Sequence, residues 1–353
     1  MSDEVLEKVI SLAVSRYKIS DFLWFGGEPL LAGLSFFKKV VALQRKYMNL
    51  YPENKVQNCI QTNAILLTDE MIQFFKENHF SISVSYDGLY NDYLRQGTEK
   101  TVENIVKCQQ SGLRVNILSI IHSANFDKQY EMLKDFQAKN LKCKFNRIFA
   151  EGNALNNSKY LIPHDAYISS TKDFFRKWLA DKDACGFSTF DICFASLFDL
   201  GHKECTFTGC MFKWIAISPL GQTYPCPRFM GSEYTFGNVM AMDNLFDCFF
   251  SEKYKELTEK AIIRRNKCKN DCPLYPYCNG GCNAQCYSNF GVENNESDLC
   301  KYVKSFFPFV VNELHNALKS NTVRNPIASK LIKEHGDRIE DVYIEMKNHG
   351  LIE

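Results

Sequence analysis

A chain of 353 residues is long enough for one large α/β unit and a smaller companion, so it can bury a sizeable core without disulfide crosslinks. Its 42 basic and 41 acidic side chains nearly cancel, which argues against nucleic acid or an anionic membrane surface as a partner. The N-terminal stretch has the apolar spacing of an amphipathic helix capped by Ser2 or Asp3. No apolar run reaches the roughly 18 residues of a membrane-spanning helix. We therefore expect a cytoplasmic protein that does not enter a membrane.

After this helix, the first 150 residues alternate between strand spacing and helix spacing. The expected strands are 21–31, 55–64, 80–88, 114–125 and 143–149, and the expected helices between them are 37–48, 68–78, 101–112 and 126–140. This alternation predicts a parallel sheet with right-handed crossovers. Residues 151–200 have the pattern of a connector with helical pieces such as 165–181. The chain ends in amphipathic segments at 301–320 and 337–350, which are expected to be helices.

Short polar motifs follow four of the expected strands, at the point where each strand ends. They are GGEP at 26–29, QTN at 61–63, SYDG at 85–88 and HSAN at 122–125. The carboxyl ends of parallel strands meet at one edge of a sheet, and loops at this edge build the active sites of such folds. Each motif alone has the residues of an ordinary turn or helix cap. Their repetition at corresponding positions predicts a functional site at this edge.

The chain has 15 cysteines, and twelve of them fall between Cys185 and Cys300. An odd count in a reducing compartment argues against complete disulfide pairing and favours metal or cluster ligation. Eight candidates are enough for two sites of four thiolates each: Cys205, Cys210, Cys226, Cys268, Cys272, Cys278, Cys282 and Cys300. Thiolates suit both iron-sulfur clusters and zinc, so residue type does not choose between them. Cys59, Cys108 and Cys143 fit ordinary small core side chains.

The spacing of these eight cysteines, with Gly221 between two of them, resembles the SPASM domain of radical SAM enzymes. The resemblance assigns one auxiliary [4Fe-4S] cluster to Cys205, Cys210, Cys226 and Cys282, and a second to Cys268, Cys272, Cys278 and Cys300. Three residues separate Cys268 from Cys272, where the family usually has two. Cys286 has the spacing of a ligand but no role in the pattern.

The first half of the chain resembles the same family. Gly26, Gly27 and Glu28 resemble the radical SAM Gly-Gly-Glu-Pro turn, whose backbone and carboxylate hold the amino group of S-adenosylmethionine. The resemblance also places Ser85 at the ribose of this cofactor. Arg95 would pair with the carboxylate of the cofactor, a contact that suits a guanidinium.

The sequence departs from the family pattern in three places. Asn91 stands where histidine is usual, and Ala64 replaces the glycine of a Thr-Asn-Gly motif. The 353 residues contain no Cys-x3-Cys-x2-Cys triplet, which in the family holds the catalytic [4Fe-4S] cluster after the first barrel strand. We expect a shortened chain, in which a third cluster would need an additional N-terminal segment. A degenerate, non-catalytic homologue is the alternative.

The resemblance thus implies an α/β fold with four parts. They are a partial (β/α)6 radical SAM barrel without its first strand at 1–150, a connector at 151–200, a small cysteine-rich α+β SPASM domain at 201–301 and a C-terminal helical region at 302–353.

The resemblance implies a maturase that modifies a peptide or small-protein side chain through a 5'-deoxyadenosyl radical. Its electron donor would be a protein such as a flavodoxin or ferredoxin. Two alternatives remain open: a non-catalytic iron-sulfur protein for electron transfer or partner binding, and a zinc-ribbon interaction module. Sulfatase maturation is disfavoured, because those enzymes place an aspartate base directly after the cysteine matched by Cys226, where this chain has Pro227.

Overall fold

The computed structural model describes residues 1–149, 154, 156–200, 204–210, 214–290, 297–320 and 323–352, with the backbone alone at 287–290. By compactness the chain divides into two units. The first unit comprises Met1–Asp87, Asn91–Leu118 and Phe212–Glu259. The second unit comprises Gly88–Tyr90, Ser119–Met211 and Lys260–Glu353. The domain limits expected from the sequence stay predictions.

Five strands form one sheet in the order β1-β2-β3-β4-β5. They are β1 (Ile19–Trp24), β2 (Lys55–Thr62), β3 (Ser81–Ser85), β4 (Val115–Ile121) and β5 (Lys142–Arg147). Each of the first three strands pairs in parallel with the next, and consecutive strands are neighbours throughout the sheet, as right-handed crossovers require. The predicted α/β class with a parallel sheet is confirmed.

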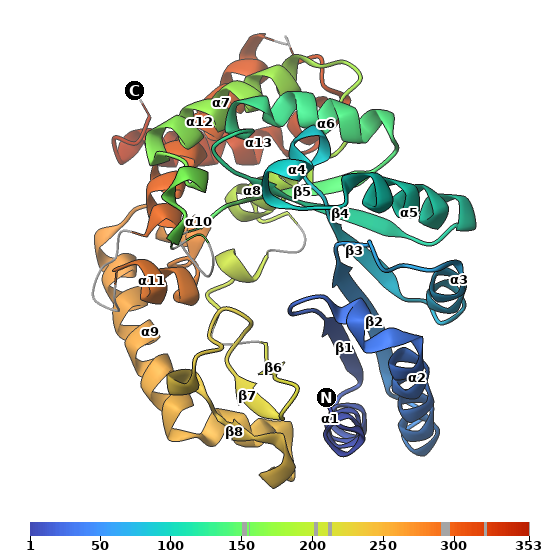
Figure 1. Ribbon diagram of the computed structural model, residues 1–353. Helices are drawn as coiled ribbons and strands as arrows, with labels where there is room; N and C mark the ends of the chain where they lie inside the picture. The colour runs from blue at the N-terminus through green and yellow to red at the C-terminus, as the bar shows by residue number, and fades with distance from the viewer. Residues whose placement is uncertain are drawn as a thin grey trace. The chain divides into compact units, whose positions relative to one another are not determined.

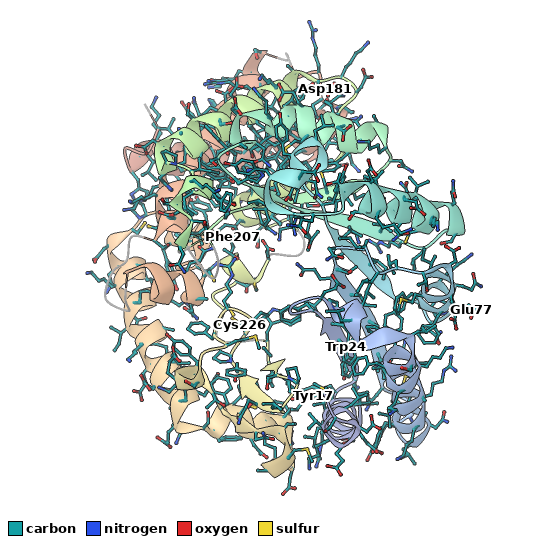
Figure 2. All side chains as sticks on the ribbon, viewed as in Figure 1. Tyr17, Trp24, Glu77, Asp181, Phe207 and Cys226 are labelled. Carbon is teal, nitrogen blue, oxygen red and sulfur yellow. The ribbon has the colours of Figure 1, made fainter. Side chains whose placement is uncertain are left out.

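Helices follow the strands in turn along this half of the chain. They are α1 (Asp3–Arg16), α2 (Gly33–Leu50), α3 (Asp69–Glu77), α4 (Asn91–Leu94), α5 (Thr98–Ser111) and α6 (Gln129–Ala138). Ser2 caps α1 as expected, because its Oγ accepts a hydrogen bond of 3.3 Å from the Val5 amide. In the first unit, α2, α3 and α5 lie along the strands (Figure 1). Apolar residues of α1 and α2 pack together with Trp24 of β1, which Figure 2 labels.

The remainder of the first unit contains little regular structure. Three short strands, β6 (Ala216–Ile217), β7 (Gln222–Tyr224) and β8 (Gly237–Asn238), form an antiparallel sheet. Gly221 begins the turn into β7 with a φ of 84°, a value that side chains with a Cβ seldom adopt. A Cβ at this position would also lie 2.9 Å from Oδ1 of Asn238.

The second unit is mostly helical. Besides α6, its helices are α7 (His164–Ala180), α8 (Ser188–Phe198), α9 (Glu252–Asp271, which begins in the first unit), α10 (Tyr275–Cys278), α11 (Asn283–Phe290), α12 (Asp298–Ser320) and α13 (Pro326–Asn348). Aromatic rings of α7, α8 and α12 form its core, with Phe175 in edge contact with Phe190 and Phe306 at 5.0 and 6.0 Å between ring centroids. None of the helices in the described ranges combines the length and apolar character needed to cross a bilayer.

Candidate cofactor-binding sites

The loop after β1 carries the predicted Gly-Gly-Glu turn. Gly26 and Gly27 both have positive φ, at 98° and 58°, a conformation that glycine adopts without the steric cost of a Cβ. Nothing in the described chain lies within 4 Å of a Cβ built at either position, so backbone conformation and not crowding requires glycine here. The turn therefore presents bare backbone at the carboxyl end of the strand.

The Glu28 carboxylate links the loop after β1 to the loop after β2. Its Oε1 accepts hydrogen bonds from Oγ1 of Thr62 at 2.7 Å and from the amide of Leu30 at 3.0 Å. Its Oε2 accepts a hydrogen bond of 2.9 Å from the amide of Asn63. Hydrogen bonds to an ionised acceptor are stronger than neutral ones, so this carboxylate fixes both loops firmly. The predicted contact of Glu28 with S-adenosylmethionine stays a prediction.

Ala64 occupies the glycine position of the Thr-Asn-Gly motif in a left-handed conformation, with φ of 63°. This conformation costs an alanine about 1–2 kcal/mol, so neighbouring contacts must hold it. The Ala64 amide donates to Oγ1 of Thr62 at 2.9 Å, and its carbonyl accepts a 2.7 Å hydrogen bond from Nδ2 of Asn104 on α5. Oγ1 of Thr101 donates to the Asn63 carbonyl at 2.9 Å. The departure from glycine thus leaves the loop conformation intact.

A buried ion pair organises the loop after β3. Asp87 is fully buried, and its Oδ2 accepts a 2.9 Å hydrogen bond from Nε of Arg95. Oδ1 of Asn91 accepts from the Asp87 amide at 3.0 Å, while its Nδ2 donates to Thr98 at 2.7 Å. Asn91 therefore acts as a loop brace at the position where the family has histidine. Ser85, the last residue of β3, is half-buried.

Arg95 keeps donor groups available beyond this pair. Within the described residues its contact with Asp87 uses Nε alone, and the side chain is 25% exposed. The buried Asp87 carboxylate therefore orients the two Nη groups of Arg95, which can bind a second anion. A carboxylate group is the ligand that matches such a guanidinium. The roles predicted for Arg95 and Ser85 stay predictions.

Four cysteines of the second unit lie near one another: Cys268, Cys272, Cys278 and Cys300, here called the second thiol group. Burial, with smaller contributions from the other three thiols, raises the pKa of the Cys278 thiol to about 12. Cys268 lies on α9, Cys278 is the last residue of α10, and Cys300 is in the first turn of α12. This is the set that the sequence assigns to the second auxiliary cluster.

Three other cysteines of the second unit are also neighbours: Cys205, Cys210 and Cys282, here called the first thiol group. Burial raises the pKa of Cys205, and Cys210, Glu204 and Cys282 add to this shift. The segment that carries Cys205 is anchored by Phe207, whose ring lies 5.5 Å from that of Phe307 (Figure 2). Cys226, the fourth predicted ligand of this cluster, belongs to the first unit, beside β7 (Figure 2). Its assignment stays a prediction.

The donor set fits iron-sulfur clusters. Within the described residues, no three His, Cys, Asp or Glu side chains converge on a position for a single metal ion. A [4Fe-4S] cluster binds each thiolate through a different iron, so its ligands surround a larger group than one ion. None of these cysteines forms a disulfide bond. Cys286 is buried on α11, one helical turn after Cys282, and is a ninth thiol in this region.

Two arginines of α9 hold the loops between these thiols, and the sequence analysis did not single them out. Nε of Arg265 donates to the Asn279 carbonyl at 3.2 Å, and its Nη1 donates to the Gly209 carbonyl at 3.3 Å. Nδ2 of Asn279 donates to the Phe207 carbonyl at 2.8 Å. Arg264 is the second arginine. The only sequence signal was their adjacency in a polar helix directly before Cys268.

Comparison with known proteins gives two family matches in this order along the chain. Residues 1–137 match the radical SAM superfamily, and residues 205–283 match the SPASM iron-sulfur cluster-binding domain. The cysteine-type anaerobic sulfatase-maturating enzyme of Clostridium novyi is 26% identical, over 92% of this chain and 89% of the relative. The serine-type enzyme of Bacteroides thetaiotaomicron is 27% identical, over 90% of this chain and 84% of the relative.

Solved structures give the same fold. Native anSMEcpe with bound AdoMet has a TM-score of 0.78 at 24% identity, covering 90% of this chain and 89% of its own. Native anSMEcpe with bound AdoMet and the Kp18Cys peptide has a TM-score of 0.75, also at 24% identity, covering 90% of each chain. The sheet with its Gly-Gly-Glu turn and the two thiol groups are thus found in a chain that matches both families. The chain is a radical SAM enzyme that carries a SPASM domain.

Proposed function

We propose that this protein modifies a side chain of a peptide or small protein by radical chemistry that starts from S-adenosylmethionine. The observation that carries the proposal is the grouping of the cysteines. Seven of the eight predicted auxiliary ligands form two separate groups of neighbouring thiols in the second unit. Relatives that align over most of this chain are sulfatase-maturating enzymes, and a similar structure holds AdoMet together with a peptide.

The loops at the carboxyl ends of β1, β2 and β3 supply the proposed S-adenosylmethionine site. The backbone of Gly26 and Gly27 would accept the amino group, held in place by the Glu28 network. The Nη groups of Arg95 would bind the carboxylate, and the Ser85 hydroxyl would face the ribose. In this family the bound S-adenosylmethionine and the catalytic cluster supply the hydrogen-abstracting radical, while the protein orients and shields it.

The two auxiliary clusters would carry electrons to or from the substrate site. Four cysteines for each cluster leave no iron open to a substrate thiol, so electron transfer is the role that suits them. The external electron donor would be a small redox protein such as a flavodoxin or ferredoxin. Pro227 stands where the sulfatase-maturating enzymes have their aspartate base, which argues against a sulfatase as the substrate.

Iron binding and S-adenosylmethionine cleavage test the proposal in two steps. Anaerobic reconstitution with iron and sulfide should load about eight irons into this chain, since two [4Fe-4S] clusters contain four irons each. The gene product translated with any in-frame sequence upstream of Met1 is then assayed for 5'-deoxyadenosine. Such a product that contains the Cys-x3-Cys-x2-Cys triplet should cleave S-adenosylmethionine in the presence of dithionite.

The same experiment separates the rival functions. A brown protein that contains the triplet and forms no 5'-deoxyadenosine would identify an iron-sulfur protein without radical chemistry. A colourless protein with two zinc ions and no sulfide would identify a zinc-ribbon module. Flavodoxin or ferredoxin in place of dithionite tests the electron donor separately.

A further inference from the structure

Arg264 is a buried cation in the middle of the cysteine-rich region. Its side chain belongs to α9 and the residue is 4% exposed. Its Nη1 donates to the Gly280 carbonyl, and its Nη2 donates to Oδ1 of Asn283 at 2.7 Å. Both acceptors are neutral oxygens. In the part of the chain that the structure describes, Arg264 has no ion pair with a carboxylate.

A buried charge of this kind is expensive unless an opposite charge compensates it. The effective cost of burying an ion in a protein is several kcal/mol even after relaxation. Neutral hydrogen-bond acceptors reduce this cost, but they do not cancel the field of the guanidinium. Arg264 therefore needs an anionic neighbour that the described protein groups do not supply.

Thiols near Arg264 become anionic when they bind a metal cluster. Arg264 and Cys268 are one turn apart on α9, so their side chains extend from the same face of the helix. The Arg264 guanidinium lies close enough to the thiols of Cys268 and Cys286 to interact electrostatically with both. A cluster held by the second thiol group would lie in this positive field.

The position of Arg264 is enforced by the backbone around it. Gly280, which accepts from Arg264, has a φ of 79°, and a Cβ there would lie 2.9 Å from Cγ of Arg265. Asn283 connects Arg264 to the segment that carries Cys210, because its Nδ2 donates a hydrogen bond of 2.5 Å to the Cys210 carbonyl. The guanidinium is thus fixed between the loop that carries Cys278 and the loop that carries Cys210. A flexible surface arginine would not hold this place.

We propose that Arg264 is the built-in counter-ion of the auxiliary cluster at Cys268, Cys272, Cys278 and Cys300, and that it raises the reduction potential of this cluster. A [4Fe-4S] cluster with four thiolates carries net negative charge, and one-electron reduction adds one more unit. A fixed buried cation stabilises the reduced form more than the oxidised form. The inference rests on the proposed function, in which this cluster exchanges electrons.

The test compares Arg264→Gln with two control variants. Glutamine keeps a donor for the Gly280 carbonyl and removes the charge, while Arg264→Lys keeps the charge and loses the forked contact. Lys267→Gln removes the same unit of charge from the exposed side of the same helix. The readouts are iron and sulfide content and an anaerobic redox titration followed by electron paramagnetic resonance.

Arg264→Gln should keep the wild-type iron content and shift one of the two cluster signals to lower potential. At the wild-type midpoint, the ratio of reduced to oxidised cluster should fall on the order of tenfold, which corresponds to about 59 mV for one electron. Arg264→Lys should retain most of the wild-type potential. Lys267→Gln should change the ratio by less than about twofold, since water and salt screen an exposed charge.

An Arg264→Gln protein with full iron content and an unchanged potential would overturn the inference. Loss of the cluster in both the Gln and Lys variants would also overturn it, because Arg264 would then be a structural clamp. A wild-type protein that takes up no iron is a distinct result. It would overturn the proposed function first and this inference with it.

Discussion

The sheet loops and the cysteine-rich region solve the problem of holding a cofactor in different ways. In the loops after β1, β2 and β3, polar groups of the protein bind one another: Glu28 binds the Thr62 hydroxyl and the Asn63 amide, and Asp87 binds Arg95. In the cysteine-rich region, neighbouring thiols contribute to the raised pKa of Cys205 and of Cys278, and no disulfide joins these cysteines. The first site is shaped by the protein alone, whereas the second needs its metal to complete it.

This difference separates two kinds of cysteine in one chain. Cys108 on α5 is fully buried, and burial alone raises its pKa to about 11, as expected for a small core side chain. The thiols of the second thiol group are partly exposed and affect one another. Mutations in the two regions should therefore affect different measured quantities.

The largest effect is expected for Cys272→Ser in the second thiol group. The variant should lose one cluster, with about four fewer irons per chain, because serine is a poor ligand for iron. The second unit should also lose several kcal/mol of unfolding free energy, since cluster binding contributes to its folding. Iron analysis and hydrogen exchange of α9 and α10 measure both effects. Cys59→Ser, in β2, is the control and should leave the iron content unchanged. A loss of iron in this variant would contradict the distinction between core cysteines and cluster ligands.

A smaller effect is expected for Asp87→Asn in the sheet region. Removing the charge of the buried partner of Arg95 should cost about 3 kcal/mol of unfolding free energy, because the guanidinium loses its compensating anion. The affinity for S-adenosylmethionine should fall as Arg95 loses its orientation, while the iron content of the auxiliary sites stays constant. Chemical denaturation and calorimetric titration measure the two quantities. An unchanged affinity would remove Arg95 from the proposed site.

Thr62→Val tests the hydrogen bonds around Glu28 and should destabilise the protein less than Asp87→Asn does. Valine has nearly the shape of threonine, but it cannot donate to Oε1 of Glu28 or accept from the Ala64 amide. The buried polar groups left without a partner should cost about 2 kcal/mol of stability. Affinity for S-adenosylmethionine should fall with it.

Thr68→Val is the matched control for this prediction. Oγ1 of Thr68 caps α3 by accepting from the Met71 amide at 3.2 Å, so the same substitution costs about 1 kcal/mol away from the loops. Its affinity for S-adenosylmethionine should equal that of wild type. Equal losses of affinity in both variants would show that general destabilisation, and not the Glu28 network, controls binding.

The smallest effect is expected for Ala64→Gly. Glycine should relieve the strain of the left-handed conformation, but it also adds freedom to the unfolded chain. The net result should be a stabilisation of about 0.5 kcal/mol with unchanged binding of S-adenosylmethionine. Thermal denaturation measures this change, and a clear destabilisation would mean that the buried methyl group of Ala64 contributes more than its strain costs.

The sequence predicted the sheet well, because its strands and helices have regular periods. The strand expected at 55–64 is β2 (Lys55–Thr62), and the helix expected at 37–48 lies within α2 (Gly33–Leu50). The helix expected at 337–350 matches the second segment of α13, and the first segment begins at Pro326, where Asn325 caps it. The two segments meet at a kink at His335, whose φ of −132° is not helical.

The site was less accessible to prediction than the fold. Residue types and spacing pointed to Glu28 and the eight cysteines, but not to the partners that hold them. Thr62 contributes through one hydroxyl, and Arg264 lies in α9, whose polar composition gives no apolar period. Such contacts depend on packing between segments far apart in the chain, which local patterns do not encode.

Cys278 and Cys282 are four residues apart, yet they belong to different thiol groups, with only Asn279, Gly280 and Gly281 between them. In the proposed assignment, one short turn is therefore shared by both clusters. Binding of a cluster at Cys282 would fix the position of Cys278, which the second cluster needs as a ligand. Assembly should then be cooperative, so that half-loaded molecules stay scarce during maturation and damage to one centre promotes loss of the other.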